Sequence, residues 1–266
     1  TNWLKTLIKP SVLNTTSISM RGGNENTKIG TSFSYFNQDG MITKSDFTRV
    51  TGRVNLDQKI SNTVKFGTNI SYTNSTTNSE DGTNNSTTSN DMFQKAITFS
   101  PYSSPYDADG NLNRYVTSDL KYNPLWNSAE YSNVTKANRF LVNLFLDIQL
   151  AKGLKYRFNS KYDTKNENQE TYQTSLHEYG DDTNGWGELG FKANKEWLVE
   201  NILTYETEIE DHDRFDITLV QSANKIRDES YSQTATEFLS DYFGVNGISN
   251  ATNLNKPVRN ISNRQS

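Results

Sequence analysis

The sequence predicts an all-β protein: an antiparallel, up-and-down transmembrane β-barrel arrangement with about eight strands. Segments in which apolar and polar residues alternate recur along the chain, and a period of two marks a strand with one apolar and one polar face. Each segment has about 10 residues, close to the number that crosses a bilayer at a tilt. The connections are alternately short and long, as in membrane barrels with a short-turn rim and a long-loop rim.

Strands are expected in segments where apolar residues occupy every second position and polar residues occupy the positions between them. The alternation is clear in five segments: 27–37, 48–59, 64–72, 140–150 and 154–162. It is weaker in three: 12–21, 197–208 and 215–224. These segments together predict the eight strands of the expected sheet.

The connections follow from these strands. Short turns are expected at 24–26, 60–62, 151–153 and 210–213, and a modest connection at 40–46. Very long connections are expected at 74–135, 165–196 and 229–266. Every second connection is therefore long. A soluble β-sandwich can share this feature by chance, so that alternative stays open.

The first long connection contains two recognisable parts. Residues 74–90 are rich in Asn, Ser and Thr and are expected to form a mobile loop. Residues 91–99 predict a short helix, with Asp91 as its N-cap and Ser100-Pro101 as its stop. One face of this helix is expected to carry its apolar residues: Met92, Phe93, Ala96 and Ile97.

Composition excludes several classes of protein. Aromatic residues make up 12% of the chain, too many for a low-complexity disordered protein despite a mean hydropathy of -0.80. A net charge of -4 argues against a nucleic-acid partner, and the absence of cysteine excludes disulfides and thiolate zinc sites. No apolar run approaches the roughly 20 residues of a membrane-spanning helix. The N-terminus has no leader pattern, so a mature or cut piece is expected.

No catalytic site, metal or cofactor is expected, and the chain is predicted not to be an enzyme. His177 and His212 lie in different connections without a metal-binding spacing. The glycine pattern at 185–190 follows a polar run rather than a strand, which argues against dinucleotide binding. Asp107 and Asp109 imitate the start of a calcium loop, but no acidic residue closes it, so a tight Asp-Gly turn is expected.

Alternation alone leaves the orientation of the two faces open, because a soluble barrel has an apolar interior and a wide membrane barrel a polar one. Strand length and loop asymmetry favour the membrane barrel. Residues expected to face its lumen are Arg49, Arg53, Lys155, Arg157 and Lys161. Residues expected to face lipid are Leu144, Leu146, Ile148, Phe158 and Ile70.

A series of short sequence words runs in order along nearly the whole chain. They are SISMRGG at 17–23, SFSYFNQDGMI at 32–42, RVTGRVNLD at 49–57, SPY at 100–102, YDADG at 106–110, NPL at 123–125, KGLKYR at 152–157 and ENILTY at 200–205. With these words the sequence resembles the SusC/RagA family of TonB-dependent outer-membrane transporters.

The resemblance implies a barrel of about 22 strands around an N-terminal plug, in the outer membrane of a Gram-negative bacterium. Its implied activity is the import of bulky nutrients such as oligosaccharides or peptides. The implied partners are TonB, which acts through the plug, a SusD-like surface lipoprotein, the substrate and membrane lipid. Residues 1–266 are expected to be a segment of the barrel with long extracellular loops, without the plug and the remaining strands.

Two other functions stay open at this point: a small outer-membrane barrel that acts as an adhesin or structural protein, and a soluble β-sandwich carbohydrate-binding module. Aromatic side chains in the long connections suit stacking on sugar or peptide in every case. The ligand-binding candidates are Tyr102, Tyr106, Trp126 and Trp186, with mere packing within the loops as the competing interpretation.

Overall fold

The structure is a computed structural model that describes residues 1–80, 92–118, 120–209 and 213–266. Its strands are β1 (Leu13–Gly23), β2 (Thr27–Asp39), β3 (Asp46–Lys59), β4 (Val64–Asn78), β5 (Tyr131–Ala151), β6 (Leu154–Gln173), β7 (Trp186–Ile209), β8 (Asp213–Thr236), β9 (Asn253–Leu254) and β10 (Val258–Gln265). Its helices are α1 (Trp3–Leu7), α2 (Met92–Thr98), α3 (Pro124–Ala129), α4 (Glu178–Thr183) and the 3-10 segment η2 (Asp241–Asn250).

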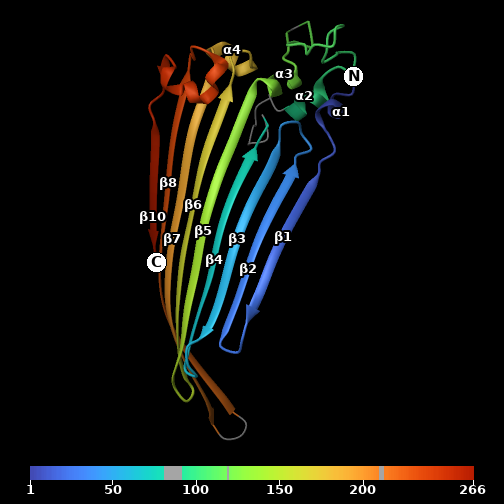
Figure 1. The fold of residues 1–266 in the computed structure, drawn as a ribbon. Coiled ribbons are helices and arrows are strands. Elements are labelled where there is room, and N and C mark those ends of the chain that lie inside the picture. Colours follow the sequence, from blue (N-terminus) through green and yellow to red (C-terminus); the bar gives the residue numbers. More distant parts are fainter. Residues whose placement is uncertain (81–91, 119, 210–212) are drawn as a thin grey trace.

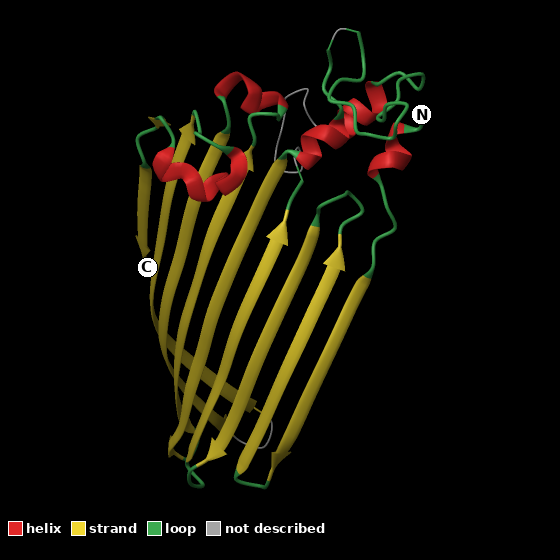
Figure 2. Ribbon diagram, turned by 45° about the horizontal axis from the view of Figure 1, so that its top comes forward, coloured by secondary structure: helices red, strands yellow, loops and turns green. Residues whose placement is uncertain are grey.

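All the strands belong to one antiparallel sheet with the order β1-β2-β3-β4-β5-β6-β7-β8-β10, and β9 pairs with β8. Each of the first eight strands thus pairs with its neighbours in sequence, which confirms the up-and-down arrangement. Figure 2 shows one curved sheet, with the helices gathered at one of its ends. β1 and β10 form the two edges of this sheet.

The two ends of the sheet differ as the connection lengths predicted. Turns of a few residues join β1 to β2, β3 to β4, and β5 to β6, and they lie at the lower end in Figure 1. The helices lie at the opposite end, which we call the helical rim. β7 ends at Ile209 and β8 begins at Asp213, so most of the turn expected at 210–213 lies outside the described residues.

The first eight strands are longer than the expected 10 or so residues: β1 has 11, β4 has 15, β5 has 21, and β7 and β8 have 24 each. Much of the predicted long connections is therefore strand, and the connection between β6 and β7 shrinks to residues 174–185. The added end of β7 alternates, with Leu189, Phe191 and Ala193 in phase, and was wrongly assigned to a connection. Other added ends were missed because they are polar on both faces, as in residues 165–170 of β6. Antiparallel pairing continues there because both faces can be in water.

The short helix of the first long connection is confirmed as α2, whereas its expected cap Asp91 and residues 81–90 lie outside the described residues. Met92 and Ala96 are buried in a cluster with Trp3 and Leu7 of α1. Ile97 is 68% exposed, so its assignment to the apolar face was wrong. The helix packs on a segment some 90 residues away in sequence, and this partner selects which of its residues are buried.

The described apolar residues that are buried lie at the helical rim rather than within the sheet. One cluster joins α1 and α2, and the other contains Tyr172, Ala235, Phe238 and Val245. The sheet itself is a single layer. Some of its large apolar side chains are exposed, for example Ile18 at 65% and Met20 at 70%. A soluble β-sandwich would cover this face with a second sheet, and the described residues form only one.

Among the described residues, no helix combines the length and the apolar content needed to cross a membrane.

Candidate functional site

The strand register places the polar residues of neighbouring strands side by side, on what we call the polar face of the sheet. One row across six strands shows this arrangement: Ser32, Arg53, Ser71, Leu141, Asp163 and Glu196. Hollows open on this face at several heights. The strand register therefore keeps the polar residues of each strand from β2 to β7 on the same face of the sheet.

Cations of β5 and β6 form ion pairs across the polar face. The Arg157 guanidinium binds both carboxylate oxygens of Asp147, with an Nε–Oδ1 distance of 2.6 Å. Arg139 donates from Nε to Asp163 Oδ1 at 2.8 Å. These pairs are partly in water and contribute little stability each, but they mark this face as one built to carry charge.

Two further predicted lumen residues lie in the same network. Lys161 donates to Glu196 at 2.8 Å, and Lys155 donates to both oxygens of Glu206 at 3.2 Å. The structure thus brings Lys155, Arg157 and Lys161 to one face, each beside a carboxylate of a neighbouring strand.

Arg49 and Arg53 lie on the same polar face, on β3, opposite Ser75 and Ser71 of β4. The opposite face holds the five residues expected to face lipid. Leu146 lies between Phe66 and Phe158, Leu144 is in the adjacent position of the same face, and Ile148 faces Tyr156. Ile70 faces Val142 on this same side.

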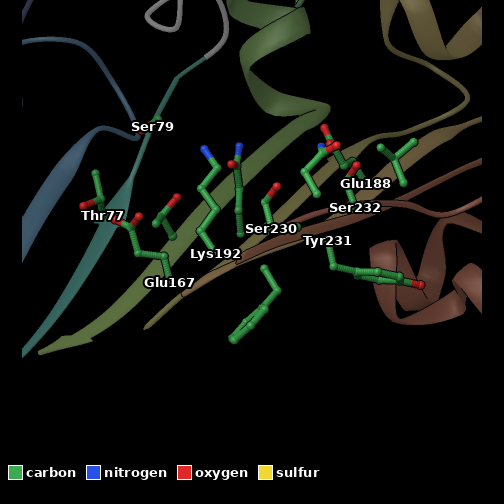
Figure 3. Close-up of a pocket in the computed structure, with 14 residues that line it drawn as sticks. Thr77, Ser79, Glu167, Glu188, Lys192, Ser230, Tyr231 and Ser232 are labelled. Atoms are coloured by element: carbon green, nitrogen blue, oxygen red, sulfur yellow. The ribbon is translucent and has the colours of Figure 1, made fainter. Parts of the chain in front are cut away.

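A hollow of about 560 Å³ lies on the polar face towards the helical rim, between β4 and β10 (Figure 3). Glu167 and Lys192 face each other across β6 and β7 at its floor, and Ser230 continues the row on β8. Figure 3 shows Tyr231 directed away from Lys192 and Glu167. The hollow is therefore lined mainly by charged and hydroxyl side chains, which suits a polar, hydrated ligand.

The four aromatic ligand candidates fall into two groups. Tyr102 is 97% exposed and Tyr106 is 47% exposed, both in the connection between α2 and α3. Trp126 on α3 is half-buried, and its indole N–H donates to the Leu176 carbonyl at 3.0 Å. Trp186 is half-buried at the start of β7. The tyrosines are thus open to a solute, whereas Trp126 also ties α3 to the connection before α4.

A buried polar network holds the helical rim together and was not predicted from the sequence. Asn127 of α3 donates to a carboxylate oxygen of Glu178 at 2.8 Å, and Lys95 of α2 forms an ion pair with the same oxygen. His177 is fully buried and is the N-cap of α4, where its Nδ1 accepts from the Tyr179 N–H. No local pattern marks these residues, because their partners lie 51 and 83 positions apart.

A second polar cluster ties the connection at 100–123 to α4. The Arg114 guanidinium donates to the Tyr122 hydroxyl at 3.1 Å and lies 2.9 Å from an Asp181 carboxylate oxygen, to which Tyr122 also donates at 2.7 Å. Burial raises the pKa of the Tyr122 phenol. The hydrogen bond from Tyr122, together with Arg114, lowers the pKa of Asp181.

This cluster predicts a pH dependence of rim mobility. Because the pKa of folded Asp181 lies below its unfolded value of about 3.9, its contribution is complete above that value and is lost as pH falls through the folded pKa. We expect hydrogen exchange of 100–123, corrected for intrinsic rates, to be unchanged from about pH 7 to 4 and to rise below it. Asp181→Asn should reduce this rise, and what remains comes from Asp107, whose pKa is also lowered within this segment. A rise already near pH 6 in the unsubstituted protein would contradict the assignment.

The Asp-Gly turn predicted at 107–111 is confirmed. The Asp107 carboxylate accepts from the Asp109 and Asn111 N–H groups at 3.0 and 2.8 Å, and Gly110 has a φ of +87° that favours glycine. The N–H of Asn111 lowers the pKa of Asp107. Among the described residues, no group of three or more His, Asp and Glu is arranged to hold a metal ion.

The glycine pattern at 185–190 opens strand β7 rather than a helix, so it lacks the geometry of a phosphate-binding turn. Gly187 has a packing role instead. A Cβ at this position would lie 2.7 Å from the Phe238 ring, so only glycine lets this ring pack on the strand. His212 lies outside the described residues.

No family model matches the sequence. Two curated proteins of Formosa agariphila are similar to it, the TonB-dependent receptors P26 and P3. P26 is 26% identical over 264 residues, covering 98% of this chain and 25% of its own, and P3 is 25% identical over 77% of this chain and 21% of its own. The chain thus spans about a quarter of the length of these relatives.

Solved structures with a similar fold include the RagAB peptide importer. Its closed-closed state has a TM-score of 0.81 at 23% identity, covering 99% of this chain and 30% of that one. P. aeruginosa FpvA bound to pyoverdines has a TM-score of 0.53 at 10% identity, covering 96% of this chain and 33% of that one. The resemblance to the SusC/RagA class of TonB-dependent transporters is confirmed, and the fold is that of a segment of their barrel wall.

Proposed function

We propose that the chain forms part of the barrel wall of a TonB-dependent transporter in the outer membrane of a Gram-negative bacterium. The observation that carries this proposal is the single-layer sheet with two unlike faces. One face bears large exposed apolar side chains, and the other bears ion pairs and hydroxyl groups. Lipid covers an apolar face of this kind in a membrane barrel, and a wet lumen accommodates the polar one.

The names of the similar proteins support import as the activity. RagAB is a peptide importer, and P26 and P3 are TonB-dependent receptors. We propose a bulky nutrient, an oligosaccharide or a peptide, as the substrate. We also propose a SusD-like surface lipoprotein at the helical rim, and TonB acting through a plug segment of the whole protein. Residues 1–266 then serve as barrel wall with extracellular loops, and catalysis is no part of this role.

The membrane location is tested by fractionation of cells that express the full-length protein. We expect the protein in the outer-membrane fraction, resistant to alkaline extraction, because the exposed apolar face requires lipid. Recovery in the soluble fraction would rule out the proposal.

The exposed tyrosines provide a second test. Replacing Tyr102 and Tyr106 with alanine should lower uptake without changing the amount of folded protein, because both side chains are open and belong to neither buried cluster of the described residues. Trp126→Ala and Trp186→Ala form the second arm, in which reduced uptake is expected together with faster proteolysis of the rim for Trp126. Uptake that stays unchanged after all four replacements would refute the role of these residues in ligand binding.

A further inference from the structure

A hollow of about 550 Å³ lies on the polar face across β1 to β5, separate from the hollow in Figure 3. Hydroxyl groups from four strands line it: Ser17, Ser19, Ser32, Ser34, Thr51, Ser71 and Thr73. Its charged lining residues are Arg49, Arg53 and Arg139. No carboxylate is among the described residues that line it, so its charge is positive.

The three arginines differ in their partners. Arg139 is held by Asp163 through two hydrogen bonds. Arg49 and Arg53 are exposed and have no carboxylate partner among the described residues, unlike Lys155, Arg157 and Lys161 of β6. Two positive charges in the hollow are thus available to a ligand.

Arg49 is held in place by aromatic rings instead of a carboxylate. Its guanidinium carbon lies 5.2 Å from the centre of the Phe36 ring and 5.9 Å from that of Phe47. A cation over an aromatic ring is attracted to the ring and needs no hydrogen bond for this contact. Arg49 is therefore restrained before any ligand arrives, and among the described residues none accepts a hydrogen bond from its guanidinium.

The hydroxyl groups around the arginines complete a donor-rich surface. Ser17 and Ser34 share a hydrogen bond of 2.9 Å, and Thr51 and Thr73 share one of 3.2 Å, across neighbouring strands. Arg53 lies between Ser32 and Ser71 in the register. Guanidinium and hydroxyl donors together are the groups that bind carboxylate, sulfate or phosphate oxygens, and arginine does so through two parallel hydrogen bonds.

The spacing of the two arginines allows each of them to bind a separate anionic group. Arg49 and Arg53 are four residues apart on one strand, so their Cα atoms are separated by about 13 Å. We propose that this hollow is an oxyanion-binding site for a solute that carries repeated carboxylate or sulfate groups. The site rests on the proposed function in one respect, namely that solute passes along the polar face.

The test measures binding to the purified full-length protein. It uses two oligomers of equal length as probes, dextran sulfate and neutral dextran. We expect dextran sulfate alone to bind. Arg49→Gln with Arg53→Gln should lower its affinity at least about tenfold, the effect of losing a charge-assisted hydrogen bond. Changing both arginines to lysine should give an intermediate loss, because the charge stays and the two-pronged contact is lost.

Lys155→Gln is the matched control, because this cation is on the same face but already paired with Glu206 in a different hollow. We expect it to change the affinity less than about twofold. Inorganic sulfate should compete with dextran sulfate in the unsubstituted protein and not in the glutamine variant. Equal affinity of the variant and the unsubstituted protein, or equal binding of both dextrans, would overturn the proposal.

A carboxylate of the same full-length protein could supply the anion instead of a solute. In that case the glutamine variant would lose thermal stability while its affinity for dextran sulfate stayed the same, and the assignment to a solute would be wrong. These measurements use purified, folded protein. A negative result in these binding measurements would therefore reject the oxyanion site alone. A negative result in the fractionation test would reject the proposed function.

Discussion

Replacing Leu146 with arginine should lower the stability of the full-length protein in a bilayer by about 2 to 4 kcal/mol, if this position lies at the midplane. Leu146 lies between Phe66 and Phe158 on the apolar face. An arginine there must leave its charge in lipid or pull water and headgroups towards it. The loss is measured by denaturant-induced unfolding in lipid vesicles.

Leu141→Arg is the matched control, because it makes the same change on the polar face, where Leu141 lies beside Asp163 in the register. We expect a smaller loss than for Leu146→Arg, since this arginine is hydrated on the polar face, although Asp163 is already held by Arg139. Equal losses for the two variants would contradict the assignment of the faces, and a larger loss for Leu141→Arg would reverse it.

The faces of the wall could be predicted from the sequence because the side-chain period of a strand is two. Once Lys155 and Arg157 fall in phase, they must share a face, and the short turn at Lys152-Gly153 sets Arg157 opposite Asp147. The ion pairs across β5 and β6 therefore follow from local geometry. The same reasoning holds for the row that contains Arg53.

The outer parts of β5 and β6, and the whole of β10, could not be predicted in this way. β10 has only two apolar residues, Val258 and Ile261, and is a strand because β8 offers it an edge to pair with. The polar extensions of β5 and β6 likewise lack alternation, whereas that of β7 alternates, with Leu189, Phe191 and Ala193 on one face. β10 and these strand extensions form because they hydrogen-bond to a neighbouring strand. A local sequence pattern does not show which segment provides that neighbouring strand.

The rim residues were predicted least well because long-range contacts select them. The Trp3 ring packs edge-on against Phe99, and Lys95 pairs with Glu178. Each contact joins segments that a single sequence gives no reason to pair. Tyr102 could be selected as a ligand-binding candidate because it is an aromatic residue in a long connection. The role of His177 in the rim could not be predicted, because its burial depends on long-range contacts.

The two halves of the polar face differ in how their positive charges are paired, which the overall composition does not show. On β5 and β6 the cations Arg139, Lys155, Arg157 and Lys161 are paired with carboxylates, which offset their charge. On β3 the cations Arg49 and Arg53 have hydroxyl and aromatic neighbours instead. The net charge of -4 thus coexists with a local positive site.

Phe238→Ala should lower the local stability of the rim around η2 by about 3 to 5 kcal/mol, the usual cost of removing a buried aromatic ring. Phe238 is 3% exposed and lies 5.0 Å, ring centre to ring centre, from Tyr172. Tyr172 in turn donates to Asp241 of η2 at 2.7 Å, so loss of the ring loosens the contact that holds η2 to the sheet. Hydrogen exchange of residues 239–255 measures this change as faster opening.

Leu239→Ala is the control for this prediction, because the neighbouring side chain is 80% exposed. We expect exchange of 239–255 to change by less than about 0.5 kcal/mol in this variant. Exchange within β6 and β7 should remain slow in both variants, since their backbone hydrogen bonds to neighbouring strands do not depend on the rim. Loss of protection throughout β6 and β7 in Phe238→Ala would show instead that the rim cluster and the wall unfold as one unit.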